Sequence, residues 1–150
     1  MGKSLPHIQY LDNRYSTYQT NKCKQSFVYT MKNSIHFYNH DEDNRVAVAA
    51  VKIGDGWAYA IQDFLRGDIQ IRRENCLDWL HRIIKAKNDV DYFYDSFGNC
   101  CTTTVTHQGV TIENEYTDDL VKNISLDDLQ IILEKWLDFI KTRKTIEFCW

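Results

Sequence analysis

The chain has 150 residues, of which 43% are hydrophobic and 26% are charged, values close to those of ordinary globular proteins. This composition excludes a disordered chain, a collagen-like repeat and a coiled-coil rod. Eighteen basic and 21 acidic residues give a formal charge of −3, so the chain lacks the basic footprint that direct nucleic-acid binding requires. The length predicts one domain spanning residues 1–150.

The sequence carries no targeting or membrane signal that we recognise. The first residues lack the apolar core of a signal peptide, and the longest apolar run, residues 46–51, is far too short to cross a bilayer. We therefore expect a cytoplasmic protein without membrane contact. An odd number of cysteines without a secretory signal predicts reduced thiols. These cysteines are Cys23, Cys76, Cys100, Cys101 and Cys149.

The first half of the chain is dominated by strand signals. Residues 1–24 show no clean periodicity, whereas β-branched and aromatic residues predict strands over 25–31, 35–38 and 46–53. Gly54-Asp55-Gly56 predicts a turn that leads into a paired strand over 57–61. The alanines of this last pair also suit a helix.

A helix and an aromatic strand are predicted next. Over residues 74–87, Leu77, Leu80 and Ile83 recur at three- and four-residue spacing, as on one face of a helix. Residues 91–97 contain four aromatic side chains and predict a strand buried on both faces, or nearly so.

The clearest hairpin joins residues 101–107 to residues 110–116. A turn at Gln108-Gly109 would pair His107 with Val110. One face of the hairpin is apolar in its middle and is expected to pack on the core. The other face is hydrophilic and is expected to meet solvent or a partner; it carries Thr102, Thr104, Thr106, Thr111, Glu113 and Glu115.

The last long element begins with a variant of the capping box. Ser125 is followed three residues later by Asp128, where Glu or Gln is usual. A broad apolar stripe then continues to Ile140, and residues 146–148 form a short closing strand or a tail. The order of strands, helix, strands and helix predicts an α+β fold, with an antiparallel sheet and two principal helices packed on it.

The sequence offers no motif for catalysis or for a metal. No phosphate-binding glycine loop and no His-Glu-x-x-His sequence is present. Cys101 and His107 share a face of the hairpin, but six residues of strand separate them by about 20 Å. Cys100-Cys101 belongs to no Cys-x-x-Cys pair, and we expect one of the two to face inward and the other outward. His36 and His40 lie near Asp41 and Asp43 at a spacing that matches no metal motif.

We therefore expect no catalytic residue, no metal and no cofactor. Acidic side chains gather instead in loops and on the hydrophilic face of the hairpin, and such a surface suits a basic protein partner. The abundant tyrosines and tryptophans are of the types that anchor protein interfaces. The candidate partner-binding residues are Glu113, Glu115, Asp118, Asp119, Asp41, Glu42 and Asp43.

Two other interpretations stay open. The chain could be a small enzyme or ligand-binding domain with an aromatic pocket, lined by Tyr92, Tyr94, Trp57 and His36. It could also be an adaptor or structural module, which the sequence does not distinguish from other protein-binding domains.

The second half of the chain resembles the small immunity proteins of bacterial contact-dependent growth inhibition and related polymorphic toxin systems. The resemblance lies in the sheet segment 101–116 and the following Ile-Ser-Leu-Asp-Asp-Leu … Leu-Glu-Lys-Trp-Leu sequence within residues 124–140. It covers about a third of the chain. It implies a cytoplasmic, non-enzymatic protein that binds one cognate toxin domain, often a nuclease, and covers its active site. The group shares no catalytic motif, so it assigns a role to no single residue.

Overall fold

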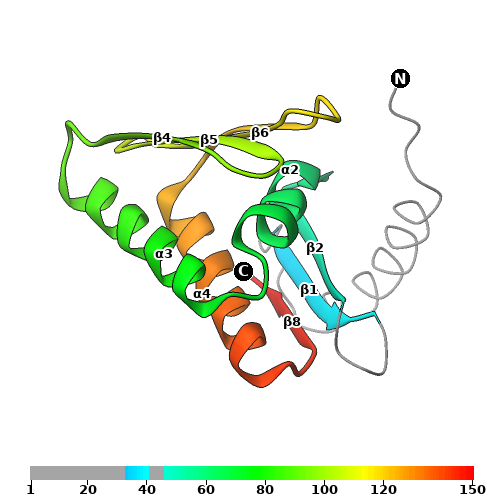
Figure 1. Ribbon diagram of the computed structural model, residues 1–150. Helices are drawn as coiled ribbons and strands as arrows, with labels where there is room; N and C mark the ends of the chain where they lie inside the picture. The colour runs from blue at the N-terminus through cyan, green and yellow to red at the C-terminus, as the bar shows by residue number, and fades with distance from the viewer. Residues whose placement is uncertain (1–32, 41–45) are drawn as a thin grey trace.

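A computed structural model describes residues 33–40 and 46–150. In these residues a layer of helices lies between two antiparallel sheets (Figure 1). Sheet 1 has the order β3-β2-β1-β8, with β1 (Ser34–Asn39), β2 (Ala47–Ile53), β3 (Gly56–Trp57) and β8 (Ile146–Cys149). Sheet 2 has the order β4-β5-β6-β7, with β4 (Phe93–Phe97), β5 (Cys101–Thr106), β6 (Gly109–Asn114) and β7 (Leu120–Ile124).

The helical layer contacts both sheets. It consists of α2 (Tyr59–Asp63), the π-helix η1 (Phe64–Ile69), α3 (Arg73–Asn88) and α4 (Leu126–Thr142). The predicted α+β class and its antiparallel pairing are confirmed, although the strands form two sheets and not one. In the described residues no helix is long and apolar enough to cross a membrane.

Both predicted long helices are confirmed. The stripe over residues 74–87 forms α3, and α4 begins after Ser125 as expected. The backbone N–H of Asp128 donates to Ser125 Oγ over 3.0 Å, which is the N-cap bond. The carboxylate of Asp128 departs from the capping box, because it accepts hydrogen bonds from Trp150 Nε1 and Asn33 Nδ2. The start of α4 is thereby tied to both ends of the described chain.

The predicted strand over residues 57–61 is wrong beyond Trp57. The pairing with β2 ends after two residues, and the chain enters α2 at Tyr59. Alanines at 58 and 60 favour a helix, and burial of Ala60, Ile61 and Gln62 in succession suits a short helix enclosed between two sheets. The Gln62 side-chain oxygen accepts a hydrogen bond from the Val51 backbone N–H over 3.0 Å, so the helix satisfies that strand amide.

The hairpin forms, but its turn lies one residue earlier than expected, which shifts the cross-strand pairing by two residues. Val105 pairs with Val110, so His107 and Gln108 make the turn and Gly109 begins β6. A Cβ atom at Gly109 would lie 2.8 Å from the carbonyl oxygen of Ile124 on β7, which explains glycine within this strand. A shift of two residues keeps every side chain on its predicted face. His107 and Tyr116 are exceptions, because they lie beyond the strand ends and are exposed.

The expectation that residues 91–97 are buried on both faces is also wrong. β4 is an edge strand, and its residues alternate between exposed and half-buried. The Tyr94 ring faces the helices, 5.9 Å from the Trp79 ring and 4.4 Å from the Arg82 guanidinium. Only one side of sheet 2 is covered by helices in the described chain, so the alternate aromatic residues of β4 remain at the surface.

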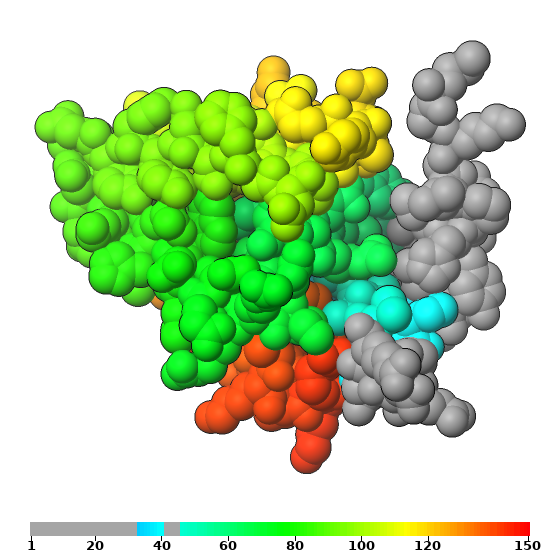
Figure 2. All heavy atoms as spheres, viewed as in Figure 1, coloured from blue at the N-terminus to red at the C-terminus, as the bar shows by residue number. Residues whose placement is uncertain are grey.

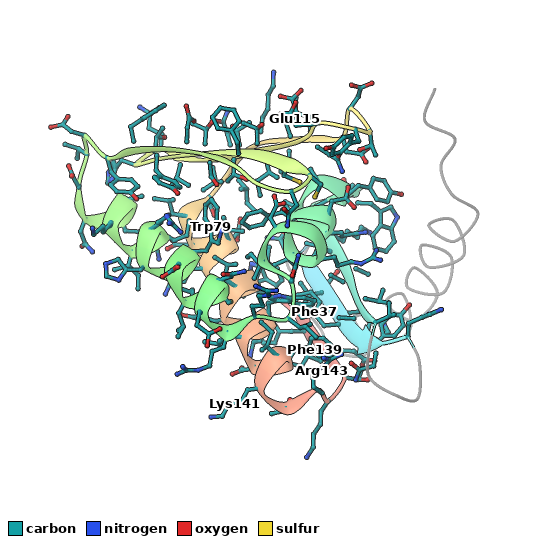
Figure 3. The ribbon with its side chains drawn as sticks, in the orientation of Figure 1. Phe37, Trp79, Glu115, Phe139, Lys141 and Arg143 are labelled. Atoms are coloured by element: carbon teal, nitrogen blue, oxygen red, sulfur yellow. The ribbon has the colours of Figure 1, made fainter. Side chains whose placement is uncertain are left out.

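Aromatic side chains join the layers. Phe37 of β1 meets Trp136 of α4 edge-on, at 4.9 Å between ring centroids, and Phe64 of η1 meets Trp79 of α3 at the same separation. Such pairs contribute about 1 kcal/mol beyond the burial of their area. Figure 3 shows Trp79 on the helix side of sheet 2 and Phe37 with Phe139 between sheet 1 and α4.

One expectation from the sequence is not tested by the structure, and another is wrong at one residue. The strand predicted over residues 25–31 lies outside the described residues. Cys149 is disulfide-bonded, so the expectation of reduced thiols is wrong at this residue, whereas Cys76, Cys100 and Cys101 are free.

Candidate protein-binding face

The strongest candidate for a functional surface is the side of sheet 2 that faces away from the helices. We call it the outer face. The cross-strand register places its residues in rows, one of which runs Phe97, Thr102, Glu113 and Leu120 across all four strands. A second row contains Asp95, Thr104 and Thr111. The opposite side of the same strands carries buried Val105 and Ile112, which pack against the helices.

Threonines of β5 hold two of the carboxylates in place. Thr104 Oγ1 donates a 2.7 Å hydrogen bond to Asp95 Oδ1 on β4, and the Thr102 hydroxyl donates to the Glu115 carboxylate beyond the end of β6. Figure 3 shows Glu115 on the side of the sheet away from Trp79 and the helices. The charges therefore point toward solvent in defined positions instead of moving freely on long side chains.

Apolar side chains flank these carboxylates. Phe93 and Phe97 of the edge strand β4 are 64% and 83% exposed, and Leu120 on the opposite edge strand is 43% exposed. In the space-filling view, β4, β5 and β6 form the yellow-green to yellow upper rim of the molecule (Figure 2). Exposed aromatic residues beside defined polar groups are typical of protein-binding surfaces.

The acidic character continues into the turn between β6 and β7. Asp118 adopts a positive φ of 62°, a conformation that aspartate tolerates better than most residues. The Asp119 carboxylate accepts a 2.8 Å hydrogen bond from Thr117 Oγ1. The turn is fixed from below, because Asn114 Oδ1 accepts hydrogen bonds from the backbone N–H groups of Tyr116 and Thr117.

Four of the seven predicted residues are thus brought to one region. Glu113 and Glu115 lie on or beside the outer face, and Asp118 and Asp119 lie in the adjoining turn. The loop residues Asp41, Glu42 and Asp43 lie outside the described residues. One exposed cation, Lys122, is on β7 beside this region, so the acidic character is strong but not uniform.

Sequence reasoning missed the contribution of β4. Asp95, Phe93 and Phe97 were not proposed as partner-binding residues, because the aromatic content of residues 91–97 suggested full burial. The alternation of exposed and half-buried positions along β4 arises because the helices cover only one side of sheet 2, which a hydrophobicity pattern within the sequence does not reveal.

A half-buried carboxylate supports the turn from the helix side. Asn114 Nδ2 donates a 2.8 Å hydrogen bond to Asp63 Oδ2 at the end of α2. Burial raises the pKa of the Asp63 carboxyl above its ordinary value, while the hydrogen bond from Asn114 acts in the opposite direction. Because Asn114 also holds the amides of the β6–β7 turn, Asp63 connects the helical layer to the acidic region.

The four residues of the alternative aromatic pocket are not brought together. Tyr92 and Tyr94 belong to the β4 region of sheet 2, whereas Trp57 and His36 belong to sheet 1. The described residues do line an open hollow of about 290 Å³ elsewhere, close to the lower limit for ligand pockets. Its lining residues are Val46, Ala47, Arg66, Gln70, Ile71 and Trp136.

The histidines considered for chemistry make structural contacts. His107 Nδ1 lies 2.7 Å from the Ala86 carbonyl oxygen at the end of α3, at the opposite end of β5 from Cys101. His36 Nε2 lies 3.6 Å from Glu147 Oε1 on β8, and its ring lies 4.6 Å from that of Tyr38. Burial raises the pKa of Glu147.

No family model matches the chain, and neither a curated protein nor a solved structure matches it. The geometry and charge of the outer face, together with the resemblance stated for residues 101–116 and 124–140, are therefore the grounds for proposing a function.

Proposed function

We propose that this protein is a non-enzymatic immunity protein, which binds a cognate and basic toxin domain through the outer face of sheet 2 and covers its active site. The observation that carries this proposal is the placement of Asp95, Glu113 and Glu115 on an exposed sheet, between apolar side chains at both edges. A nuclease toxin would supply the complementary charge, because it must hold nucleic acid with basic residues.

The fixed carboxylates favour recognition of such a partner. Threonine hydroxyls hold Asp95 and Glu115, which lowers the conformational entropy that binding would otherwise cost. Opposite charges also accelerate the encounter, and this acceleration falls as salt increases. Phe93 and Phe97 are then available as apolar anchors.

The area of sheet 2 implies that the β6–β7 turn also contributes to the proposed interface. Four strands about 4.8 Å apart and some five residues long cover a flat area of roughly 350 Å². A stable interface buries about 800 Å² on each partner. The partner must therefore reach beyond the strands, and the turn with Tyr116 and Asp118 is the adjacent exposed and acidic surface.

The test is capture followed by neutralisation. The full-length protein is used as bait in a lysate of its source cells, and captured proteins are identified by mass spectrometry. The purified partner is then assayed alone and with increasing amounts of this protein. We expect a basic toxin domain that binds at one-to-one stoichiometry and loses its activity in the complex.

Two results would contradict the proposal. A partner that binds tightly but has no toxic activity would make the protein an adaptor. Failure to capture a partner, combined with a small molecule that raises the melting temperature, would favour a ligand-binding domain.

A further inference from the structure

A second candidate site lies at one end of sheet 2, where the β4–β5 turn meets η1. It is formed by the neighbouring thiols of Cys100 and Cys101 and by the carboxylate of Asp68. The two Sγ atoms are 3.5 Å apart, and one ligand atom from each of the three residues lies within 4.8 Å of the others. Asp68 is 32 residues away from Cys100 in the sequence, so the fold alone creates this grouping.

Backbone hydrogen bonds hold the carboxylate against the two cysteines. Asp68 Oδ1 accepts from the Cys100 N–H over 2.9 Å, and Oδ2 accepts from the Cys101 N–H over 3.2 Å. The arrangement also depends on two glycines. A Cβ atom at Gly98 would lie 2.3 Å from the Asp68 carboxyl carbon, and a Cβ atom at Gly67 would lie 2.5 Å from Cys100 Sγ.

The sulfur separation suits a bound metal ion. Two zinc–sulfur bonds of about 2.3 Å at a tetrahedral angle place the sulfur atoms about 3.8 Å apart, which is close to the observed 3.5 Å. Thiolates select zinc and other soft cations over magnesium or calcium. Two thiolates and one carboxylate would also place three negative charges around one divalent ion.

We propose that Cys100, Cys101 and Asp68 form a binding site for a thiophilic divalent cation of the zinc or cadmium type. The three side chains leave one tetrahedral position for water or another ligand. The site is independent of the proposed binding partner, because it lies at the helix side of the sheet and involves none of the outer-face carboxylates.

The cation must replace contacts that the thiols make in the metal-free protein. Cys100 Sγ donates to the Asp63 carbonyl oxygen at 3.4 Å, and Cys101 Sγ donates to that of Ala60 at 3.8 Å. Burial raises the pKa of Cys100 to about 11 and raises that of Cys101 as well. Both thiols are therefore protonated near neutral pH, and binding releases their two protons to solvent as the two metal–sulfur bonds form.

The experiment is a cadmium titration of the full-length, chelator-treated protein in which the disulfide of Cys149 is kept intact. The thiolate-to-cadmium charge-transfer absorption reports binding through sulfur, and competition with zinc gives the relative affinity. We expect one equivalent of cadmium to produce the band. Cys100→Ser should weaken binding more than about tenfold, and Asp68→Asn should weaken it with the band retained.

Cys76→Ser is the matched control, because Cys76 is a buried free thiol on α3 whose Sγ donates to the Leu133 carbonyl oxygen. This variant should bind cadmium as the wild type does. Circular dichroism of Cys100→Ser establishes that the half-buried position tolerates serine, and zinc should raise the melting temperature of the wild type but not of this variant. Absence of the band at one equivalent, or a band of wild-type intensity and wild-type affinity in folded Cys100→Ser, would overturn the proposal.

Discussion

Thr103 is a polar residue in an apolar position. It is 1% exposed on the helix side of β5, and its hydroxyl has no hydrogen-bond partner among the residues that the structure describes. A buried and unsatisfied hydroxyl costs about 1–3 kcal/mol. The neighbouring Thr104 faces outward and donates to Asp95, so two adjacent threonines have opposite surroundings.

We expect Thr103→Val to raise the free energy of unfolding by about 1 kcal/mol, because valine fills the same volume without a hydroxyl to satisfy. Thr104→Val is the control and should leave stability unchanged or lower it slightly. Urea denaturation of both variants measures the difference. A destabilised Thr103→Val would mean that the hydroxyl has a partner.

Asp63 makes stability depend on pH. Its pKa is raised in the folded state above the ordinary value of 3.8, so the folded protein binds a proton more readily than the unfolded chain does. Its contribution therefore favours folding at low pH and is lost as pH rises through the folded pKa. Asp63→Asn removes this titration, and its side-chain oxygen still accepts from Asn114.

We expect the stability of the wild type relative to Asp63→Asn to increase as pH falls from 7 toward 4. Chemical denaturation of both proteins across this range measures the difference between their free energies of unfolding. Titrating groups that behave alike in the two proteins cancel in this difference. A difference that stays constant, or that changes in the opposite direction, would contradict the raised pKa.

Gly98 is required for the contact between the β4–β5 turn and Asp68. A Cβ atom at this position would overlap the carboxylate at 2.3–2.6 Å, so Gly98→Ala should lower the free energy of unfolding by about 1–3 kcal/mol. Gly56→Ala is the control, because no atom lies within 4 Å of the added carbon; it should change stability by less than about 0.5 kcal/mol. Equal effects in thermal denaturation would contradict the predicted clash.

At the scale of elements, the N-cap of α4 can be tested directly. Ser125 Oγ accepts from the Asp128 N–H, and loss of such a cap costs about 1 kcal/mol. We expect Ser125→Ala to lower stability by this amount and Ser125→Asp to retain it, because aspartate is an equally good cap. If both variants lose the same stability in urea denaturation, the cap is not the cause.

The elements that could be predicted from sequence are those whose signals are local. Ser125 and the apolar stripe behind it predicted α4, and the alternation over residues 101–116 predicted which residues of the hairpin face the core. Long-range contacts decided the other elements. The carbonyl oxygen of Ile124 leaves no room for a side chain at position 109, so glycine belongs to β6 and not to the turn. Enclosure between two sheets favours a helix over residues 59–63.

The candidate sites likewise include residues that a local pattern predicts and residues that only long-range contacts bring into place. Glu113 and Glu115 could be assigned to an outward face because alternation along one hairpin fixes that face. Asp95 could not, because its placement depends on which side of β4 the helices cover. The grouping of Asp68 with Cys100 and Cys101 depends on contact between η1 and the β4–β5 turn, and no spacing within the sequence reports such a contact.

At the scale of the whole molecule, the layered order explains why sheet 2 offers a candidate surface in the described part of the chain. The helices cover the inner side of sheet 2, and the acidic and aromatic residues of its other side face solvent (Figure 3). A rigid sheet on a packed core holds these residues with little freedom, which favours specific binding.

We propose that the outer face is the binding surface, and charge reversal on that face tests this. The control is a charge reversal at an exposed acidic residue that lies outside the outer face. Asp127 is a poor choice, because its carboxylate pairs with Lys87 Nζ at 2.5 Å and charge reversal would break this pair. Asp138 is exposed on α4 in the helical layer, and a lysine there reverses one charge outside the proposed interface.

The most direct measurement is the Kd of the captured toxin domain for wild type, Glu113→Lys/Glu115→Lys and Asp138→Lys at low and physiological salt. We expect the double variant to bind at least about tenfold more weakly, or about 1.4 kcal/mol, with a smaller salt dependence, and Asp138→Lys to bind nearly as the wild type does. Equal affinities for all three proteins would contradict the assignment of the outer face as the binding surface.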